Sequence, residues 1–346
     1  MDHGAPSGVP AVFVTRGSRV ESVHAVAACV ADAGGRLALA LGDIETPVYL
    51  RSAAKPFIAA EVVASGAVAR FGFSSRELAV IAASHNAEPF HVAAVRSILS
   101  KIGLDESALR CGVHAPLYEP AARALAASGH VPGAIHNNCS GKHAGILAEC
   151  VHLGLDTAGY LAAGHPVQQR ILAFCARVLE EPLQTLPIAV DGCGIPVFAT
   201  SLRRAARAFA RLGALEKLAV DDARALGAVR DAMAAEPAFV AGTGRFDSAL
   251  IGATEGRVVG KGGAEGVHGD ALGREGLGLV VKVIDGNRRA TPPAVLALLD
   301  KIGALEPAEL AALSAFARPD VRNVAGDVVG AIAARVPDTK VYGSAS

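Results

Sequence analysis

The pattern that most constrains the fold of this chain is strand-like sequence at both ends around a long helical middle. Apolar residues alternate or run together in short segments bounded by turn residues, as they do in β-strands. These segments are residues 12–15, 21–30, 36–43, 248–251, 257–261 and 277–283. Residues 56–241 instead favour helices, and capping residues precede two of them at 74–77 and 105–107.

The simplest packing joins both β-like ends in one mainly antiparallel sheet, made from residues of about 10–50 and 245–285. Helices cover this sheet, a helical lobe of residues of about 56–241 is inserted, and helices within about 290–335 end the chain. We therefore expect a mixed α/β (α+β) fold in which residues 1–346 form a single catalytic domain.

The composition argues against several classes of partner. Lysine plus arginine total 33 and aspartate plus glutamate total 33, so no net charge attracts nucleic acid or an anionic membrane. No apolar run approaches the roughly 18 residues of a membrane span, and the first residues do not resemble a signal peptide. The six cysteines show no disulfide framework. We expect a cytoplasmic protein with reduced thiols.

The segment LRSAAKPF, residues 50–57, carries the first candidates for catalysis. Ser52 and Lys55 are three residues apart, a spacing that lets two side chains meet on one helix face. A neutral lysine amine can accept the proton of a serine hydroxyl and make it a nucleophile. Lowering a lysine pKa from about 10.4 to near 7 takes roughly 4–5 kcal/mol, which burial and a second cation can supply. The alternative is a helix N-cap followed by a solvated lysine.

Pro56 fits only the first turn of a helix, which places Ser52 close to free backbone N–H groups that can stabilise an oxyanion. Two later segments add candidates: Ser84 in ASHNAE, and Lys261 in KGGAEG. A helix end and a strand end are the ordinary structural alternatives for these two residues. The order of an early Ser-x-x-Lys, a serine loop and a Lys-Gly-Gly strand resembles that of penicillin-recognising serine acyl-enzymes.

Two loops rich in small and polar residues interrupt the helical middle. They read HNNCSGKHAG, with Cys139, Lys142 and His143, and DGCGIP, with Asp191 and Cys193. Such loops usually carry function. Cys139 and Cys193 are candidate zinc ligands with Lys142 or His143 beside them, and the alternative is that both cysteines are buried apolar residues.

Six separated motifs together resemble the rhizobial-type, thermolabile L-asparaginases of the asparaginase II family. They are VTRGSRVESVH, RSAAKP, ASHNAE, NNCSGKHAG, DGCGIP and GKGGAEG, and the similarity extends to RNVAGDVVG. The resemblance implies a fold similar to serine β-lactamases, penicillin-binding proteins and glutaminases. It also implies hydrolysis of L-asparagine to L-aspartate and ammonia, and a homodimer.

The resemblance also implies roles for individual residues. Ser52 would be the nucleophile with Lys55 as its base, and Ser84 with Lys261 would form a second pair. Cys139, Lys142 and Cys193 match the zinc ligands of the family. Asp191 and His143 would contact the substrate or support the ligands. Arg51 is expected to bind the substrate carboxylate because a guanidinium can bond it through two N–H groups.

Two alternatives stay open at this point. The chain could be another serine hydrolase of the same superfamily, either a glutaminase or an enzyme that hydrolyses penicillins. It could also be a module that binds an amino acid or zinc without catalysis, although two Ser-Lys pairs argue against that. Rates with asparagine, glutamine and a β-lactam separate the hydrolases, and calorimetry that shows binding without turnover identifies the module.

Overall fold

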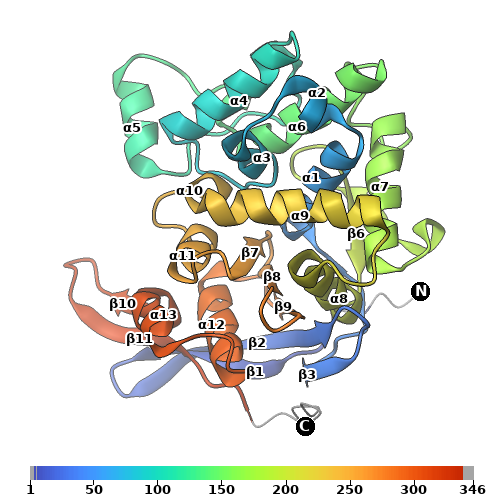
Figure 1. Cartoon of the computed structure of the whole chain (residues 1–346). Helices are drawn as coiled ribbons and strands as arrows, with labels where there is room; N and C mark the ends of the chain where they lie inside the picture. Colours follow the sequence, from blue (N-terminus) through green and yellow to red (C-terminus); the bar gives the residue numbers. More distant parts are fainter. Residues whose placement is uncertain (1–3, 5, 338–346) are drawn as a thin grey trace. The chain divides into compact units, whose positions relative to one another are not determined.

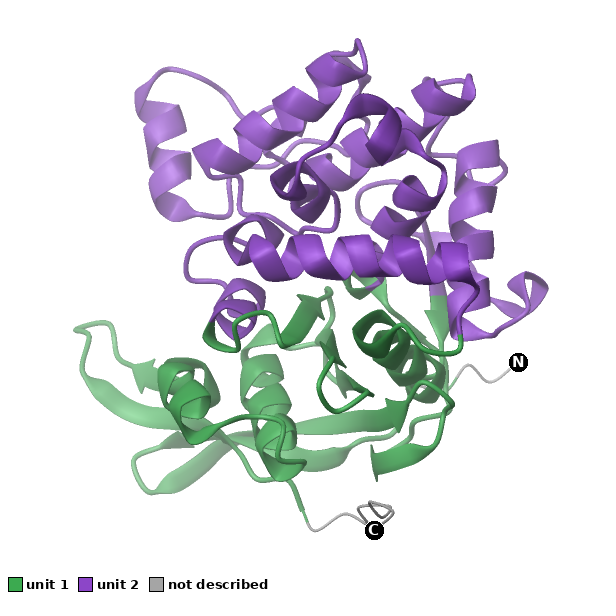
Figure 2. Cartoon of the chain, in the orientation of Figure 1, with its two compact units in different colours: residues 1–53, 199–217, 253–346 green, residues 54–198, 218–252 purple. Residues whose placement is uncertain are grey.

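The computed structural model of the chain describes residues 4 and 6–337 and contains two compact units (Figure 1, Figure 2). Unit 1 consists of residues 1–53, 199–217 and 253–346, and unit 2 of residues 54–198 and 218–252. Unit 1 contains most of the strands and unit 2 most of the helices. The expected mixture of helices and sheet is confirmed, and the single catalytic domain stays a prediction.

An antiparallel sheet of eight strands is the centre of unit 1. The strand order is β10-β11-β1-β2-β9-β8-β7, and β3 also pairs with β2. The strands are β1 (Val9–Arg16), β2 (Arg19–Asp32), β3 (Leu37–Leu41), β7 (Val258–Gly262), β8 (Val267–Leu272), β9 (Leu277–Val283), β10 (Asp320–Arg322) and β11 (Val328–Ala334). The long strand β2 pairs with β9 on one edge, so β1 and β3 share its other edge. The first and last parts of the chain thus meet in one sheet, as expected.

Helix α8 (Leu202–Ala214) packs directly on β2, β8 and β9 of this sheet. Two glycines make the close approach possible. A Cβ atom at Gly269 would lie 2.1 Å from the Phe209 ring, and one at Gly278 would lie 2.0 Å from the Ala206 carbonyl oxygen. Helix α12 (Thr291–Lys301) packs on β9 and β11, and the short helices α13 (Pro307–Ala312) and α14 (Ser314–Ala317) follow it.

The prediction of a strand at residues 248–251 is wrong. These residues lie in helix α11 (Phe246–Ala253). A run of four apolar or small residues fits a strand and a buried helix equally well, so periodicity could not separate the two. The Ser248 hydroxyl accepts the Gly242 N–H at 2.9 Å and donates to the Pro237 carbonyl at 2.7 Å, which anchors the first turn of the helix.

The prediction that helices fill residues 290–335 is also wrong beyond α14. Strands β10 and β11 follow, and β11 pairs with β1, more than 300 residues earlier, in a register that places Val14 opposite Ile332. Gly330 permits this pairing because a Cβ atom there would lie 1.8 Å from the Thr15 carbonyl oxygen. An alanine-rich segment has high local helix propensity, and the distant strand overrides it.

Strands also occur inside the middle region that the sequence indicates as helical. They are β5 (Ile188–Val190) and β6 (Pro196–Thr200). In unit 2 these strands form a hairpin around residues 191–195, and in unit 1 the last two residues of β6 pair with β4 (Val48–Tyr49). The loop that carries Asp191 and Cys193 is therefore a hairpin turn.

Unit 2 is a group of helices around α6 (Ser140–Leu153), whose first eleven residues are all buried. The other helices of the unit are α1 (Lys55–Ala64), α2 (Ala67–Phe71), α3 (Ser75–Ile81), α4 (Pro89–Lys101), α5 (Glu119–Ala127), α7 (Pro166–Leu179), α9 (Val220–Ala235), α10 (Pro237–Val240) and most of α11. Helix α6 contacts α1, α2, α3, α4 and α7. The expected capping box is present at the start of α3, where Ser74 and Glu77 bond each other's backbone N–H groups.

Two glycines allow α6 to lie against α3. A Cβ atom at Gly141 would lie 2.1 Å from the Val80 carbonyl oxygen, and one at Gly145 would lie 2.6 Å from the Ile81 side chain. Because Ser84 comes directly after α3, this packing brings the Ser84 loop next to the first turn of α6. That turn carries Lys142.

A buried pair of carboxyl groups joins α1, α6 and α7. Arg170 donates to Glu61 at 2.7 Å and to Glu149 at 2.8 Å. Burial and then the neighbouring Glu61 raise the pKa of Glu149 to about 8, against the opposing effect of Arg170. Burial also raises the pKa of Glu61. The folded protein therefore holds a proton on this pair at neutral pH.

We expect Glu149→Gln to change how stability depends on pH. The folded protein keeps the Glu149 proton up to about pH 8, whereas the unfolded chain loses it near pH 4.5, so the free energy of unfolding falls as pH rises between these values. Glutamine removes this contribution. Urea unfolding should show that the variant gains roughly 2–4 kcal/mol relative to the parent between pH 5 and 9. Glu119→Gln, at an exposed position, is the control and should show no such gain.

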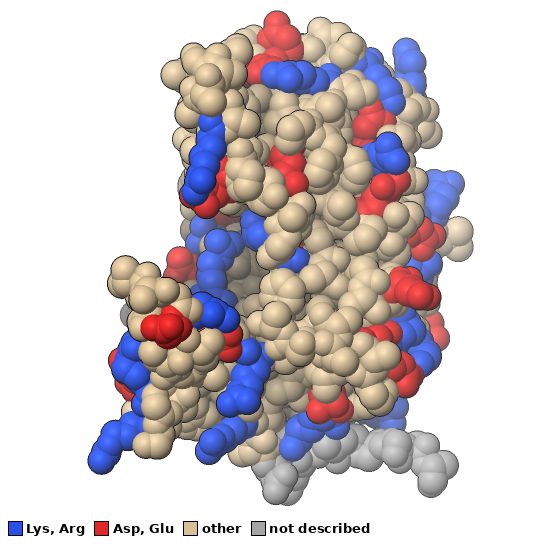
Figure 3. All heavy atoms as spheres, turned by 90° about the vertical axis from the view of Figure 1, so that its left-hand side faces the viewer, with Lys and Arg blue, Asp and Glu red and all other residues tan. Residues whose placement is uncertain are grey.

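Charges of both signs are interspersed among uncharged residues on the face shown in Figure 3. This mixture agrees with the equal numbers of acidic and basic residues in the chain. Among the residues that the structure describes, no helix is both long and apolar enough to cross a membrane.

Candidate active site

The predicted site residues lie in both units. In unit 2, Lys55 begins α1, Ser84 follows α3, Cys139 and Lys142 lie at the start of α6, and Cys193 lies in the β5–β6 turn. In unit 1, Arg51 and Ser52 lie in the 3-10 helix η1 (Arg51–Ala54), and Lys261 lies in β7. The boundary between the units falls after Ala53, between Ser52 and Lys55.

Lys55 is buried and has three hydrogen-bond partners. Its side chain is 1% exposed, and its Nζ atom lies 2.5 Å from the Ala83 carbonyl oxygen, 3.2 Å from that of Asn138 and 3.1 Å from the Ser84 hydroxyl. The amine donates to all three oxygens. When it is neutral, its two N–H groups can bond the carbonyl groups, and its lone pair is then available for the hydroxyl proton of Ser84. The structure thus joins Lys55 to Ser84.

Burial lowers the pKa of Lys55, and the positive charge of Lys142 lowers it further, while the Cys139 thiolate opposes the shift. The second cation that a neutral lysine needs is therefore Lys142, in the first turn of α6. The structure brings these two lysines together because α1, which begins with Lys55, packs against α6, although the two motifs are more than eighty residues apart.

Cys139, Lys142 and Cys193 form a buried cluster in unit 2, and each is at most 5% exposed. Lys142 donates to the Cys193 sulfur at 2.8 Å. A hydrogen bond from Cys193 lowers the pKa of Cys139 well below its usual range, and the same bond raises the pKa of Cys193. Burial opposes the charge on Lys142, but the two sulfur atoms outweigh it and raise its pKa. The cluster thus balances a thiolate with an ammonium.

The donor set of this cluster suits a zinc ion, because zinc binds thiolate sulfur and nitrogen in tetrahedral sites. Within residues 4 and 6–337, no three histidine, cysteine, aspartate or glutamate side chains form a group that could hold a metal. A metal here would therefore need the Lys142 amine in addition to the two sulfur atoms. Asp191 lies close by, with a carboxylate oxygen 3.9 Å from the Cys193 sulfur.

His143 lies next to this cluster and is fully buried. Burial and the charges of Lys142 and Lys55 hold its pKa well below the usual range, so the imidazole is neutral. Its Nδ1 atom is 2.8 Å from the Tyr160 hydroxyl. Tyr160 is a site residue that the sequence did not indicate, because it stands in an ordinary loop with no motif around it.

The sequence also missed a link between the Ser84 loop and the start of α6. His85 is fully buried, and its Nε2 atom lies 2.9 Å from the Ser140 hydroxyl, which donates to the Ile135 carbonyl oxygen. The His85 Nδ1 atom accepts the Ala87 N–H, so Nε2 carries the proton. His85 stands in the ASHNAE motif next to Ser84, but the motif alone does not indicate that its side chain bonds Ser140.

In unit 1, strand β7 ends against the segment that carries Ser52. A Cβ atom at Gly263 would lie 2.6 Å from the Leu50 carbonyl oxygen and 3.2 Å from the Ala53 nitrogen. The second glycine of the Lys-Gly-Gly sequence is thus required by a neighbouring backbone. Lys261 is buried, and its Nζ atom donates to the Gly262 carbonyl oxygen at 2.6 Å. Arg51 has a φ of 52°, which is uncommon for a residue with a side chain.

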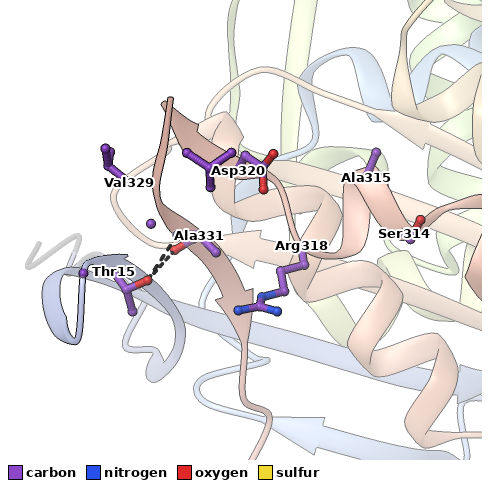
Figure 4. A pocket seen from close by; sticks show the side chains of 10 residues that line it. Thr15, Ser314, Ala315, Arg318, Asp320, Val329 and Ala331 are labelled. Atoms are coloured by element: carbon purple, nitrogen blue, oxygen red, sulfur yellow. Dashed lines mark hydrogen bonds between the residues drawn. The ribbon is translucent and has the colours of Figure 1, made fainter. Parts of the chain in front are cut away.

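A surface hollow of about 770 Å³ in unit 1 contains none of the predicted site residues (Figure 4). Thr15, Arg318 and Asp320 are among its lining residues, and Thr15 bonds the Ala331 backbone beside it. The hollow lies along β11, which has β10 and β1 as neighbours in the sheet, and the described residues that line it include no lysine, histidine or cysteine.

No curated protein matches the chain in a sequence comparison. The family model of L-asparaginase II matches residues 12–334, which include every predicted site residue. This range covers nearly all of the 346 residues. The chain therefore belongs to the L-asparaginase II family.

Proposed function

We propose that this protein is an L-asparaginase that hydrolyses the side-chain amide of L-asparagine to L-aspartate and ammonia. The observation that carries the proposal is the environment of Lys55: a fully buried amine bonded to a serine hydroxyl and two carbonyl groups, in a chain of the L-asparaginase II family. A structural lysine gains nothing from such burial, because removing an ammonium from water is costly. A general base does gain from burial, because burial favours the neutral amine that can accept a proton.

In the proposed reaction, Lys55 accepts the hydroxyl proton of Ser52, and the Ser52 oxygen bonds the amide carbon. The C–N bond of the amide then breaks. The amide nitrogen takes the proton that Lys55 accepted and leaves as ammonia. Water then attacks the resulting ester of Ser52. One proton of this water restores the Ser52 hydroxyl, and L-aspartate is released. Support comes from the local chain: η1 carries Ser52 and continues directly into α1, which begins with Lys55.

We propose that Ser84 relays the proton between Lys55 and the reacting groups, since its hydroxyl is already bonded to Lys55. We propose that Lys261 forms the second Ser-Lys pair with Ser84. Arg51, Asp191 and His143 are proposed to hold the substrate. Similarity of the fold to serine β-lactamases belongs to the same proposal. The homodimer and the cytoplasmic location stay predictions.

Cys139, Lys142 and Cys193 would hold a zinc ion. A bound zinc ion supplies positive charge that can fix a substrate carboxylate or polarise a carbonyl group. The residues themselves set the conditions for binding: Cys193 must release its proton to the solvent, and Lys142 must become neutral before its lone pair can reach a metal. Both requirements weaken metal binding in acid.

We expect Cys139→Ser and Cys193→Ser proteins to lose bound zinc, while Cys150→Ser, which changes a buried cysteine of α6, keeps it. Removal of a ligand should lower the affinity for zinc by more than the roughly 10–100-fold that is lost when a residue hydrogen-bonded to a ligand is removed. Chelator competition with metal analysis measures this. Affinity should also fall as pH falls. Equal zinc content in the three variants would contradict the proposed ligands.

The function is tested by ammonia release from L-asparagine, measured beside L-glutamine and a chromogenic β-lactam under the same conditions. The proposal expects asparagine to give the highest kcat/KM. A higher value for glutamine or the β-lactam would assign the chain to another activity of the superfamily. Binding of asparagine without ammonia release would identify a binding module.

A further inference from the structure

The two ring nitrogens of His143 have different surroundings. Nδ1 lies 2.8 Å from the Tyr160 hydroxyl, and Nε2 is buried without a hydrogen-bond partner among residues 4 and 6–337. The Tyr160 side chain is itself fully buried, and its hydroxyl also receives the Arg110 backbone N–H at 2.9 Å. The positions of the protons on His143 and Tyr160 decide whether Nε2 of His143 is a hydrogen-bond donor or an acceptor.

Hydrogen-bond counting separates the two possible tautomers. If Nδ1 carried the proton, Tyr160 would receive two donors, its own O–H would need another acceptor, and Nε2 would be a second unbonded group. If Nε2 carries the proton, the Tyr160 hydroxyl donates to Nδ1 and accepts the Arg110 N–H. Every polar group of the set except the Nε2–H is then bonded. Leaving one buried polar group unbonded costs less than leaving two.

We propose that Tyr160 is a positioning residue that fixes His143 as the Nε2–H tautomer, so that this N–H donates to an oxygen of the bound amino acid. This inference rests on the proposed function, which places His143 against the substrate. It adds the direction of the hydrogen bond and the residue that sets it. A carboxylate or amide oxygen is the matching acceptor, because an N–H group cannot bond a cation.

The surroundings hold Tyr160 and His143 rigidly. Their rings meet edge to face at 5.6 Å and 78°, and the Tyr160 carbonyl oxygen accepts the Gln168 side chain at 2.8 Å. His143 follows Lys142 directly on α6, and the positive charges of Lys142 and Lys55 act on its ring. An anionic oxygen there would meet positive charge and a directed donor together. With its proton on Nε2, His143 also has no lone pair there for a metal.

Nitrogen-15 NMR of the histidine-labelled protein, as purified with its metal, tests the tautomer without turnover. The His143 signals are identified by their loss in His143→Gln. We expect a protonated Nε2 in the parent and a changed or mixed tautomer in Tyr160→Phe. A protonated Nδ1 in the parent would overturn the inference. Addition of L-aspartate should shift the His143 Nε2–H signal, and an unchanged signal at saturation would overturn the acceptor assignment.

Kinetics then separate positioning from general structural damage. Tyr160→Phe should raise KM for L-asparagine about 10-fold with less than about a 3-fold change in kcat. In a His143→Gln protein, whose amide retains a donor, adding Tyr160→Phe should change KM less than about 2-fold. Equal effects in both backgrounds would overturn the role of Tyr160. Tyr118→Phe, in the same unit, is the control for loss of a tyrosine hydroxyl.

The two hypotheses fail in different ways. If the NMR result is as expected but asparagine gives no ammonia, the proposed function fails and the tautomer stands. If asparagine is hydrolysed but the parent carries its proton on Nδ1, the enzyme stands and the inference fails.

Discussion

Ser52→Ala is expected to lower ammonia release from L-asparagine by roughly 10⁴-fold or more, because the variant has no oxygen to form the ester. Ser52 lies in η1, before α1, and is partly exposed, so alanine at this position creates no large buried cavity. The fold should therefore be unchanged. The measurement is kcat at saturating asparagine, with circular dichroism and zinc content recorded on the same sample.

Ser84→Ala is the matched control because it removes the other serine hydroxyl that the proposed mechanism uses. Lys55 keeps its two carbonyl partners in this variant and loses only the Ser84 bond. Loss of a proton relay should cost about 10²–10⁴-fold and leave a slow ester in place, which mass spectrometry can detect on Ser52. If Ser52→Ala stays fully active while Ser84→Ala is inactive, the nucleophile is Ser84 and the proposed assignment is wrong.

Lys55→Arg and Lys55→Met are both expected to lower kcat by about 10³–10⁴-fold, since neither side chain can accept a proton at neutral pH. The pair distinguishes two roles for Lys55. Arginine keeps a positive charge, and methionine keeps the length and burial of the side chain without charge. Thermal unfolding of each variant shows whether the buried position tolerates the change.

The pH dependence of the parent enzyme gives a second measure of the same role. Only the neutral amine acts as a base, so kcat should rise with pH up to the pKa of Lys55, which burial places below its ordinary value, and then level off. An active Lys55→Arg protein would show that the site needs a cation at this position and that another group is the base.

Both predictions depend on a local feature that the sequence indicated and on a contact that it did not. The spacing of Ser52 and Lys55 is visible in the chain, and so is the restriction that Pro56 places on the helix start. The bond between Lys55 and Ser84 requires the segment after α3 to meet the first residue of α1. No property of residues 52–56 alone indicates that neighbour.

The sequence by itself determined the class of fold, the family and most of the candidate side chains, because strand periodicity, turn residues and short motifs are properties of neighbouring residues. It also indicated that β-like ends would share a sheet. Its errors at residues 248–251 and in β11 occurred where short apolar or alanine-rich segments fit either structure. For β11, a partner strand more than 300 residues earlier in the chain decided the outcome.

Only the tertiary structure decided which charges face one another. Burial and the amine of Lys142 lower the pKa of Lys55, and the sulfur atoms of Cys139 and Cys193 keep Lys142 charged. Tyr160, with no motif around it, bonds His143. Proton positions follow from solvent exclusion and from distances between segments far apart in the chain, and a linear sequence records neither.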